Sequence, residues 1–305
     1  MPQLLTNSYA SPEGVWVRGN LHGHSRESSA CATVSLQEGI RKHHDFGARF
    51  LAITDHDHVT DLSDARRQWP DIVFLEGFEW SASENILFIG ETVPPLYETS
   101  LREALRQASE LLTVICHPKP SRSRDYWTVS MIAALDPAPL GMEIYNAHYS
   151  RRHLVYPDPN PLYTDIWDSL LSKGLHLWGF ANDDSHDPSD YGRTLTMAFV
   201  KDLSPRSLMA ALKAGRFYAS TGLLMESVQV EGREIRVRLA SSATGRFIGP
   251  GGRVLASTEG REHSYVHSGE AYIRFEAESP EGRIFLQPFF TQGGNAPRVS
   301  PKILS

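Results

Sequence analysis

Histidines and carboxylates able to bind a metal ion follow the ends of several short apolar segments in this chain. The first are His22 and His24, which stand two residues apart just after the alternating segment VWVRGNL. Residues i and i+2 of an extended strand point to the same face, so these two imidazoles can converge on one cation. Similar side chains follow later apolar segments: Asp55, His56, Asp57 and His58, then Glu79, then His117, and finally Asp183, Asp184 and His186.

The elements that must position these side chains alternate between strand-like and helical patterns from Val15 to about Gly222. The strand-like runs cover residues 49–54, 71–79, 85–90, 111–116, 141–145 and 175–181. Serine caps begin three of the intervening helices, at Ser35 (with Glu38), Ser100 (with Glu103) and Ser204 (before Pro205). This alternation predicts parallel strands joined by crossover helices, in an α/β barrel or an open sheet.

The carboxyl ends of the strands of an α/β barrel gather on one face of the molecule. Each polar motif alone has an ordinary explanation as a cap, a turn or a surface histidine, but their joint occurrence at successive strand ends favours a metal site. Imidazole and carboxylate ligands without thiolate suit Zn²⁺, Mn²⁺ or Fe²⁺. The ligands outnumber the needs of one tetrahedral ion and would serve two or three ions that share a bridging carboxylate.

After about Leu223 the pattern changes to period-two alternation separated by glycine and proline turns, with no helical pattern. We therefore expect an α/β domain over residues 1–222 and a small antiparallel all-β domain over residues 223–305. The β domain carries no chemical motif. Packing against the barrel, shaping the rim of the site and forming an oligomer contact all remain open as its role.

The composition argues against several classes of partner. The net charge is −6 and no basic block occurs, so neither a nucleic acid nor an anionic membrane is expected. Two cysteines are too few for a disulfide scaffold, and we expect reduced, buried thiols, with Cys31 as a metal ligand the alternative. The sequence has no signal-peptide pattern and no apolar run of about 18 residues, so a cytoplasmic location without a membrane span is expected.

The ordered motifs H-x-H, T-D-H, E-x-S, H-P and D-x-H resemble those of the PHP (polymerase and histidinol phosphatase) superfamily over roughly residues 15–220. The segment LKAGRFYASTG followed by a β domain is similar to the CehA/McbA-like branch. This resemblance implies an α/β fold, a distorted (β/α)7 PHP barrel followed by a small C-terminal all-β domain, with a metal cluster at the carboxyl ends of the strands. The metal ligands that it implies are His22, His24, His56, Glu79, His117, Asp184 and His186.

The resemblance assigns these ligands to three metal positions. The first has His22, His24 and Asp184, the second has His117, Glu79 bridges these two, and the third has His56 and His186. It also makes Asp55 and Asp183 partners that orient the imidazoles.

Two positions depart from the family pattern. Ser29 stands where an aspartate or histidine usually follows the H-x-H motif, and Asn85 stands where a histidine often follows the glutamate. Glu27 or Cys31 would replace the first missing ligand only with unusual spacing. We therefore expect one or two ions per chain rather than three, with the first position best preserved.

These residues predict a metal-dependent hydrolase, foremost a phosphoesterase that uses a metal-activated hydroxide on a small anionic substrate. Lys119, Arg193 and Arg26 are candidate cations for the charge that develops on the substrate, with solvated surface charges as the alternative. His148 is the candidate general acid. A hydrolase of carboxylic esters or carbamates and a metal-binding scaffold without catalysis are the alternative functions.

Overall fold

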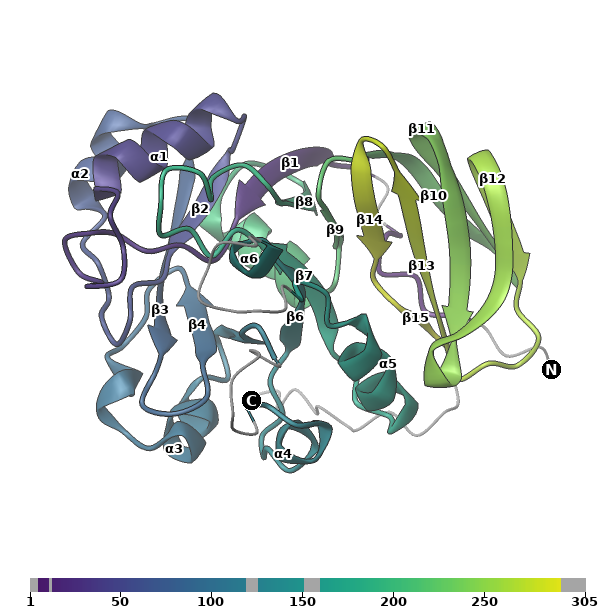
Figure 1. Cartoon of the computed structure of the whole chain (residues 1–305), viewed down its shortest axis with the longest axis horizontal. Coiled ribbons are helices and arrows are strands. Elements are labelled where there is room, and N and C mark those ends of the chain that lie inside the picture. The colour runs from purple at the N-terminus through teal and green to yellow at the C-terminus, as the bar shows by residue number, and fades with distance from the viewer. Residues whose placement is uncertain (1–4, 11–12, 119–125, 151–159, 292–305) are drawn as a thin grey trace, which may run out of the picture.

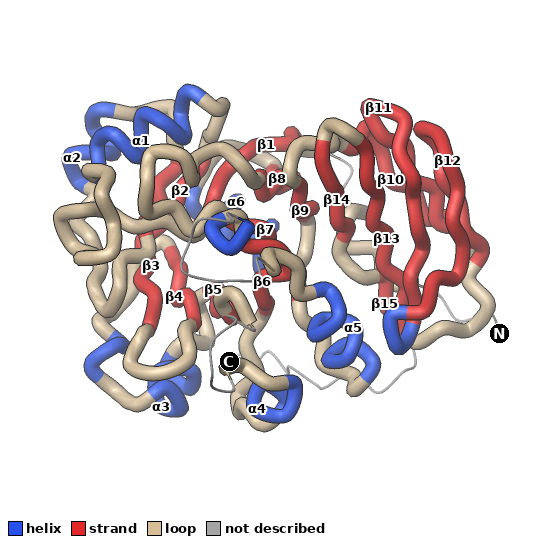
Figure 2. Tube along the Cα trace, viewed as in Figure 1, coloured by secondary structure: helices blue, strands red, loops and turns tan. Residues whose placement is uncertain are grey.

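The computed structural model describes residues 5–10, 13–118, 126–150 and 160–291, and shows a barrel region beside a C-terminal region of long strands (Figure 1). Helices gather around the barrel strands, while the C-terminal region is almost entirely strand (Figure 2). This is the α/β barrel followed by a β region that the sequence predicts. In the part of the chain described here, no helix is both long and apolar enough to cross a membrane.

Seven neighbouring strands make the barrel, in chain order. They are β1 (Val15–Asn20), β2 (Phe50–Ile53), β3 (Val73–Trp80), β4 (Ile86–Gly90), β5 (Leu112–Ile115), β6 (Gly141–Asn146) and β7 (Trp178–Asn182). The pairs β1–β2, β2–β3, β5–β6 and β6–β7 are parallel, as predicted. β4 is antiparallel to both of its neighbours, because the short link from Trp80 to Ile86 leaves no room for a crossover helix.

The segments that follow β1 and β7 close the barrel. The amide of His24 donates to the carbonyl of Ser185 at 3.0 Å, and the amide of Asp184 donates to the carbonyl of His22 at 3.0 Å. A Cβ on Gly23 would lie 2.6 Å from Oγ of Ser185, so a larger residue at this position would require the Ser185 hydroxyl to move. The H-G-H motif therefore provides both the main-chain hydrogen bonds that close the barrel and two candidate ligands.

Six α-helices and three 3₁₀ turns are described. They are α1 (Leu36–Asp45), α2 (Ser63–Gln68), α3 (Leu101–Gln107), α4 (Val129–Ala133), α5 (Thr164–Ser172), α6 (Pro205–Lys213), η1 (Leu96–Glu98), η2 (His148–Ser150) and η3 (Pro250–Gly252). The three predicted serine caps are confirmed, because each hydroxyl accepts a hydrogen bond from the amide three residues later. Each of these caps also fixes the direction in which the chain leaves the preceding loop.

The remaining strands are antiparallel to their neighbours. They are β8 (Leu195–Val200), β9 (Phe217–Ser220), β10 (Met225–Glu231), β11 (Glu234–Gly249), β12 (Arg253–Val266), β13 (Tyr272–Ser279), β14 (Gly282–Leu286) and β15 (Phe289–Phe290). Because β8 pairs with β1 and β9 pairs with β14, one sheet runs from the barrel into the C-terminal region. The division at residue 222 stays a prediction, since strands on both sides of it share hydrogen bonds.

Two buried polar contacts also join the regions. Arg274 of β13 makes a bidentate ion pair with Asp168 of α5, with both N–O distances 2.7 Å. The side-chain amide of Gln287 accepts from the amide of Gly179 and donates to its carbonyl, each at 2.8 Å. Gln287 therefore acts as a strand partner for β7.

Candidate metal centre

The structure brings all seven predicted metal ligands to one face of the barrel. His22 and His24 follow β1, His56 follows β2, and Glu79 lies near the end of β3. His117 follows β5, and Asp184 and His186 follow β7. Their side chains interact across the barrel although the motifs lie up to about 160 residues apart in the chain.

The first predicted position is a compact group of four side chains. Nε2 of His22 lies 3.3 Å from Oε2 of Glu79 and 3.2 Å from Oδ1 of Asp184. Nε2 of His24 lies 3.3 Å and 3.1 Å from the same two oxygens. Each of the two imidazole nitrogens therefore lies within 3.3 Å of one oxygen from each carboxylate, and nitrogen and oxygen donors of this kind suit a divalent ion.

Unsatisfied polar atoms at this point fit a cation. Oε2 of Glu79 and Nδ1 of His56 are buried and lie 3.1 Å apart, yet neither has a hydrogen-bond partner among the described residues. A buried polar atom without a partner costs about 1–3 kcal/mol. A divalent ion would satisfy both atoms, so the residues present fit the predicted metal.

The second predicted position is built around His117. Its Nε2 lies 3.2 Å from Oε1 of Glu79, the oxygen that does not face the first position. Glu79 therefore contacts ligands of both positions, as a bridging carboxylate must. The buried thiol of Cys116 belongs to the same group of potential ligands, together with His22.

The third predicted position, His56 with His186, also includes His24 in the structure, and each of the three imidazoles offers a ligand nitrogen within 4.8 Å of the others. Nδ1 of His186 donates to the main-chain carbonyl of Asp184 at 2.8 Å. That bond leaves Nε2 of His186 with the free lone pair, which is the atom that can bind a metal.

Two ligands have left-handed backbone conformations. The φ angle is 25° at His117 and 51° at Asp184. A residue with a Cβ rarely takes such a value, and its cost of about 1–3 kcal/mol is typical of functional sites. The strain coincides with the turns that aim both side chains into the cluster.

Glu143 on β6 is the central supporting residue, a role that none of the sequence motifs assigned to it. Its carboxylate accepts from Nδ1 of His22 at 2.8 Å and from the amide of His117 at 2.7 Å. It also accepts from the side-chain amides of Asn146 and Asn182. A carboxylate behind a ligating imidazole fixes the tautomer and strengthens the ligand. The sequence feature that could have indicated this role is the single glutamate within the otherwise apolar strand GMEIY.

Ser29 and Asn85, the two residues that depart from the family pattern, hydrogen-bond to residues around the site. Oγ of Ser29 donates to Asp55 at 2.7 Å, accepts from the amide of His56 at 3.1 Å and lies 3.4 Å from Nδ1 of His24. Asn85 hydrogen-bonds to Tyr126, whose hydroxyl lies 3.5 Å from Nδ1 of His117. The structure therefore leaves both side chains engaged outside the cluster of ligand atoms.

Asp55 and Asp183 differ from the role expected of them. Asp55 accepts from Ser25, Ser29 and Thr60, and so organises the loops around the site. Asp183 accepts from three successive amides, those of residues 192–194. Neither carboxylate hydrogen-bonds to a ligand imidazole among the described residues. Glu143 does so instead, because β6 lies directly behind His22.

The cluster gathers buried negative charge that a cation would balance. Burial alone would lower the pKa of His22, but the carboxylates of Asp184, Glu79 and Glu143 raise it well above its usual value. Burial would raise the pKa of Glu79 and of Asp184, but neighbouring imidazoles, His22 foremost, hold both well below their usual values. A protonated imidazole therefore balances the buried carboxylates.

The predicted catalytic residues lie around the cluster with different degrees of contact. His148 is near it, with its ring centroid 4.6 Å from that of His186 and its Nδ1 3.4 Å from Oδ2 of buried Asp190. Arg193 is exposed and donates to the carbonyl of Ser189, and no contact among the described residues joins it to the histidines. Lys119 lies outside the described residues.

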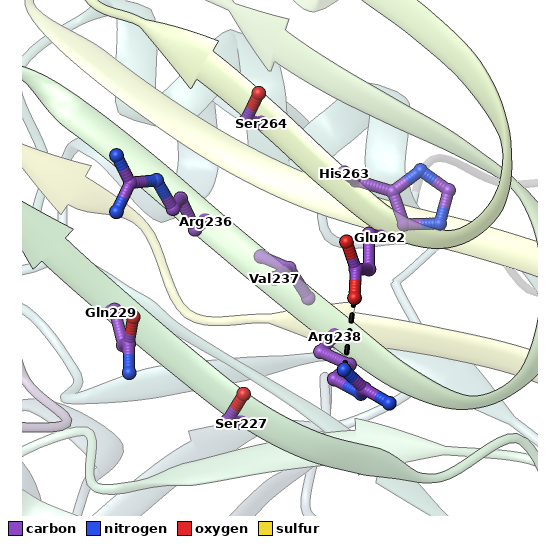
Figure 3. Close-up of a pocket in the computed structure, with 8 residues that line it drawn as sticks. All are labelled: Ser227, Gln229, Arg236, Val237, Arg238, Glu262, His263 and Ser264. Atoms are coloured by element: carbon purple, nitrogen blue, oxygen red, sulfur yellow. Dashed lines mark hydrogen bonds and ion pairs between the residues drawn. The ribbon is translucent and has the colours of Figure 1, made fainter.

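A separate hollow of about 570 Å³ lies on the C-terminal strands β10, β11 and β12 (Figure 3). Its arginines are already paired, Arg236 with Glu231 and Glu234, and Arg238 with Glu226 and Glu262. The described part of the hollow holds no group of potential metal ligands. The candidate chemistry therefore resides at the barrel.

Comparisons with known proteins bear on the fold. No family model matches the sequence, and no curated protein matches it. The structure is similar to a two-domain protein from Bacteroides vulgatus that contains a predicted PHP-like metal-dependent phosphoesterase, with a TM-score of 0.52 and 18% identity, over 94% of this chain and 98% of that one.

Two weaker likenesses cover less of the chain. An amidohydrolase from Chromobacterium violaceum has a TM-score of 0.43 at 17% identity, over 57% of this chain and 89% of that one. A lesion-specific endonuclease from Pyrococcus furiosus has a TM-score of 0.46 at 17% identity, over 65% of this chain and 56% of that one. Membership of the CehA/McbA-like branch stays a prediction. The likeness along nearly the whole chain shows that this protein shares the overall fold of the Bacteroides vulgatus protein.

Proposed function

We propose that the protein is a metal-dependent hydrolase, foremost a phosphoesterase. The observation that carries this proposal is the convergence of His22, His24, Glu79 and Asp184 on one point, with nitrogen–oxygen distances of 3.1–3.3 Å. Oε2 of Glu79, which is buried and has no hydrogen-bond partner among the described residues, supports the same proposal. The name of the Bacteroides vulgatus protein, a predicted metal-dependent phosphoesterase, favours phosphoester substrates.

The proposed cofactor is one or two divalent ions of zinc, manganese or iron. His22, His24, Glu79 and Asp184 would hold the first ion, and Glu79 with His117 would hold the second. Such ions supply Lewis acidity and lower the pKa of a bound water to about 7. Imidazole and carboxylate ligands are compatible with all three metals.

The chain's own groups supply the proton and the charge compensation. His148 is the proposed proton donor to the leaving group, with Nε2 as the proposed transferring atom because Nδ1 lies 3.4 Å from Oδ2 of Asp190. Lys119 and Arg193 are the proposed cations for a small anionic substrate. Nucleic acid is not proposed as a substrate, because the net charge is −6 and no basic block occurs.

The proposal is tested by metal content and turnover together. Protein purified without added metal or chelator is analysed for its elements, then assayed on p-nitrophenyl phosphate, bis(p-nitrophenyl) phosphate and p-nitrophenyl acetate. We expect at least one zinc, manganese or iron per chain, and phosphoester cleavage that a chelator abolishes.

Variants separate catalysis from a structural role. His22→Ala is expected to lose the ion and at least about 100-fold in rate, whereas His58→Ala, an exposed histidine outside the cluster, should match the parent protein. Cleavage of the acetate alone would favour the carboxylic ester or carbamate alternative. Bound metal with no turnover, and only a lower melting temperature for His22→Ala, would favour the scaffold.

A further inference from the structure

Cys116 places a fully buried sulfur among the candidate ligands of the barrel. It follows β5 and directly precedes His117. Its sulfur is one of four potential ligand atoms that all lie within 4.8 Å of one another, the others belonging to His22, Glu79 and His117. Cys31, the other cysteine, is exposed, contrary to the expectation of two buried thiols, and belongs to no such group among the described residues.

The spacing of these four atoms is near that of ligands around one ion. Zinc bonds sulfur at about 2.3 Å and imidazole nitrogen at about 2.0 Å, so two ligand atoms of one tetrahedral ion lie about 3.5 Å apart. All four side chains are buried, and they come from the ends of three different strands. A small contraction of the group would therefore bring the sulfur of Cys116 to bonding distance of an ion that Glu79 and His117 share.

Two further observations favour a cation beside this thiol. The thiol donates to the main-chain carbonyl of Val114, with a sulfur–oxygen distance of 3.7 Å, which leaves the lone pairs of the sulfur for a ligand bond. Oε2 of Glu79, a member of the same group, is buried and has no hydrogen-bond partner among the described residues. A sulfur with available lone pairs and an unpartnered carboxylate oxygen together are donors that a divalent ion would satisfy.

Asn85, which stands where the family often has a histidine, does not supply the missing ligand. Its side-chain oxygen accepts from the hydroxyl of Tyr126. Its main-chain carbonyl accepts from the amide of Cys116 at 3.1 Å, so the two residues are neighbours across β4 and β5. The second metal position therefore keeps Glu79 and His117, and Cys116 is the member of the group that has no other assigned role.

We propose that Cys116 is a thiolate ligand of the second metal ion, together with His117 and the bridging Glu79. This inference rests on the metal centre of the proposed function but not on its hydrolytic activity. On binding, the sulfur–metal bond forms as the S–H bond breaks and its proton leaves to solvent, and no electron is transferred. The soft sulfur ligand favours zinc over manganese at this position.

Cobalt substitution tests the sulfur ligand directly. We expect titration of the metal-free protein with Co²⁺ to produce a sulfur-to-cobalt charge-transfer band in the near ultraviolet. Cys116→Ser should abolish the band, whereas Cys31→Ser, the matched control at the exposed cysteine, should keep it. A band that survives in Cys116→Ser, or that Cys31→Ser removes, would overturn the proposal. The spectrum of the parent protein keeps the test decisive if Cys116→Ser does not fold.

Metal preference separates a ligand from a residue that only packs in the core. Loss of a thiolate ligand should weaken the binding of Zn²⁺ at the second position at least about tenfold and the binding of Mn²⁺ much less. A change in packing alone would weaken the binding of both metals equally. Competition with a fluorescent chelator measures both affinities in the parent protein and in Cys116→Ser, and equal losses for the two metals would overturn the inference.

The outcomes separate this inference from the proposed hydrolase. Cobalt that is bound to the parent protein, as measured by elemental analysis, without the charge-transfer band would overturn the inference alone. A protein that binds no cobalt would overturn both the inference and the metal centre. A charge-transfer band in a protein without turnover would support the inference and leave the hydrolase without support.

Discussion

His22 is a candidate metal ligand, and its protonated form balances the negative charge of the carboxylates around it. Its Nδ1 donates to Glu143, while its Nε2 faces Glu79 and Asp184. Three buried carboxylates around one imidazole are costly without a positive charge among them. In the metal-free protein that charge is the proton on His22, and a metal ion would take its place.

This exchange predicts that metal binding releases protons near neutral pH. The folded-state pKa of His22 is raised, so its contribution to the stability of the metal-free protein is fully present below the ordinary value of 6.5 and is lost as the pH rises through the raised value. Metal affinity should therefore increase with pH over that window. Calorimetric titration with Zn²⁺ in buffers of different ionisation enthalpy measures the released protons, and a buffer-independent enthalpy would contradict the prediction.

Glu143→Gln tests the support behind the ligands. The variant keeps the volume but loses the charged acceptor for Nδ1 of His22 and for the amide of His117. We expect metal affinity to fall by about 10–100-fold. Competition with a fluorescent chelator measures this, and Glu98→Gln, at an exposed site, is the control. Unchanged affinity in a folded Glu143→Gln protein would show that the carboxylate does not tune the ligand.

At the scale of elements, strand ends bring the ligands together and strand edges bring the two regions together. β1 and β7 meet through the segments that carry His22, His24 and Asp184, so the closure of the barrel and the assembly of the site are one event. α5 lies between the barrel strands and the C-terminal strands (Figure 1) and contacts β13 through Asp168 and Arg274. Arg274 is 2% exposed there and lies over the ring of Trp167.

The ion pair between α5 and β13 should contribute strongly to stability. Arg274→Leu leaves Asp168 buried without its partner, and we expect a loss of about 3–5 kcal/mol in the free energy of unfolding by urea. Arg283→Leu removes the exposed pair with Glu278 and should cost about 1 kcal/mol or less. Equal losses in the two variants would contradict the importance assigned to burial.

At the scale of the whole molecule, one sheet connects the barrel to the C-terminal region through β9 and β14. Gln287 extends this continuity by pairing with Gly179 on β7. Separate unfolding of either region would break buried hydrogen bonds in the other, which links their stabilities.

We therefore expect a single unfolding transition. All six tryptophans lie before residue 222, whereas the long strands that follow contribute to the circular dichroism of the sheet. Tryptophan fluorescence and far-ultraviolet circular dichroism should give the same midpoint in urea. A dichroism change that continues after the fluorescence change is complete would show that the C-terminal region unfolds independently.

Local patterns predicted the parts of this molecule that depend on near neighbours in the chain. The serine caps, the strand–helix alternation and the change to period two after residue 223 each need only a few adjacent residues, and all appear in the structure. Period-two alternation does not predict β12, because its sequence RVLASTEGREHSYV has no regular alternation of apolar residues. β4 is antiparallel because the link between β3 and β4 is short, and the periodicity of apolar residues does not report this length.

The sequence by itself determined which residue types stand at the strand ends, and so the seven side chains that could hold metal. Only the tertiary structure decided how they are supported, with Glu143 behind His22, 121 residues away, and Tyr126 beside His117. The physical reason is that motif spacing reports which residues share a strand end. A hydrogen bond between distant segments depends instead on how the whole barrel closes, which no local pattern contains.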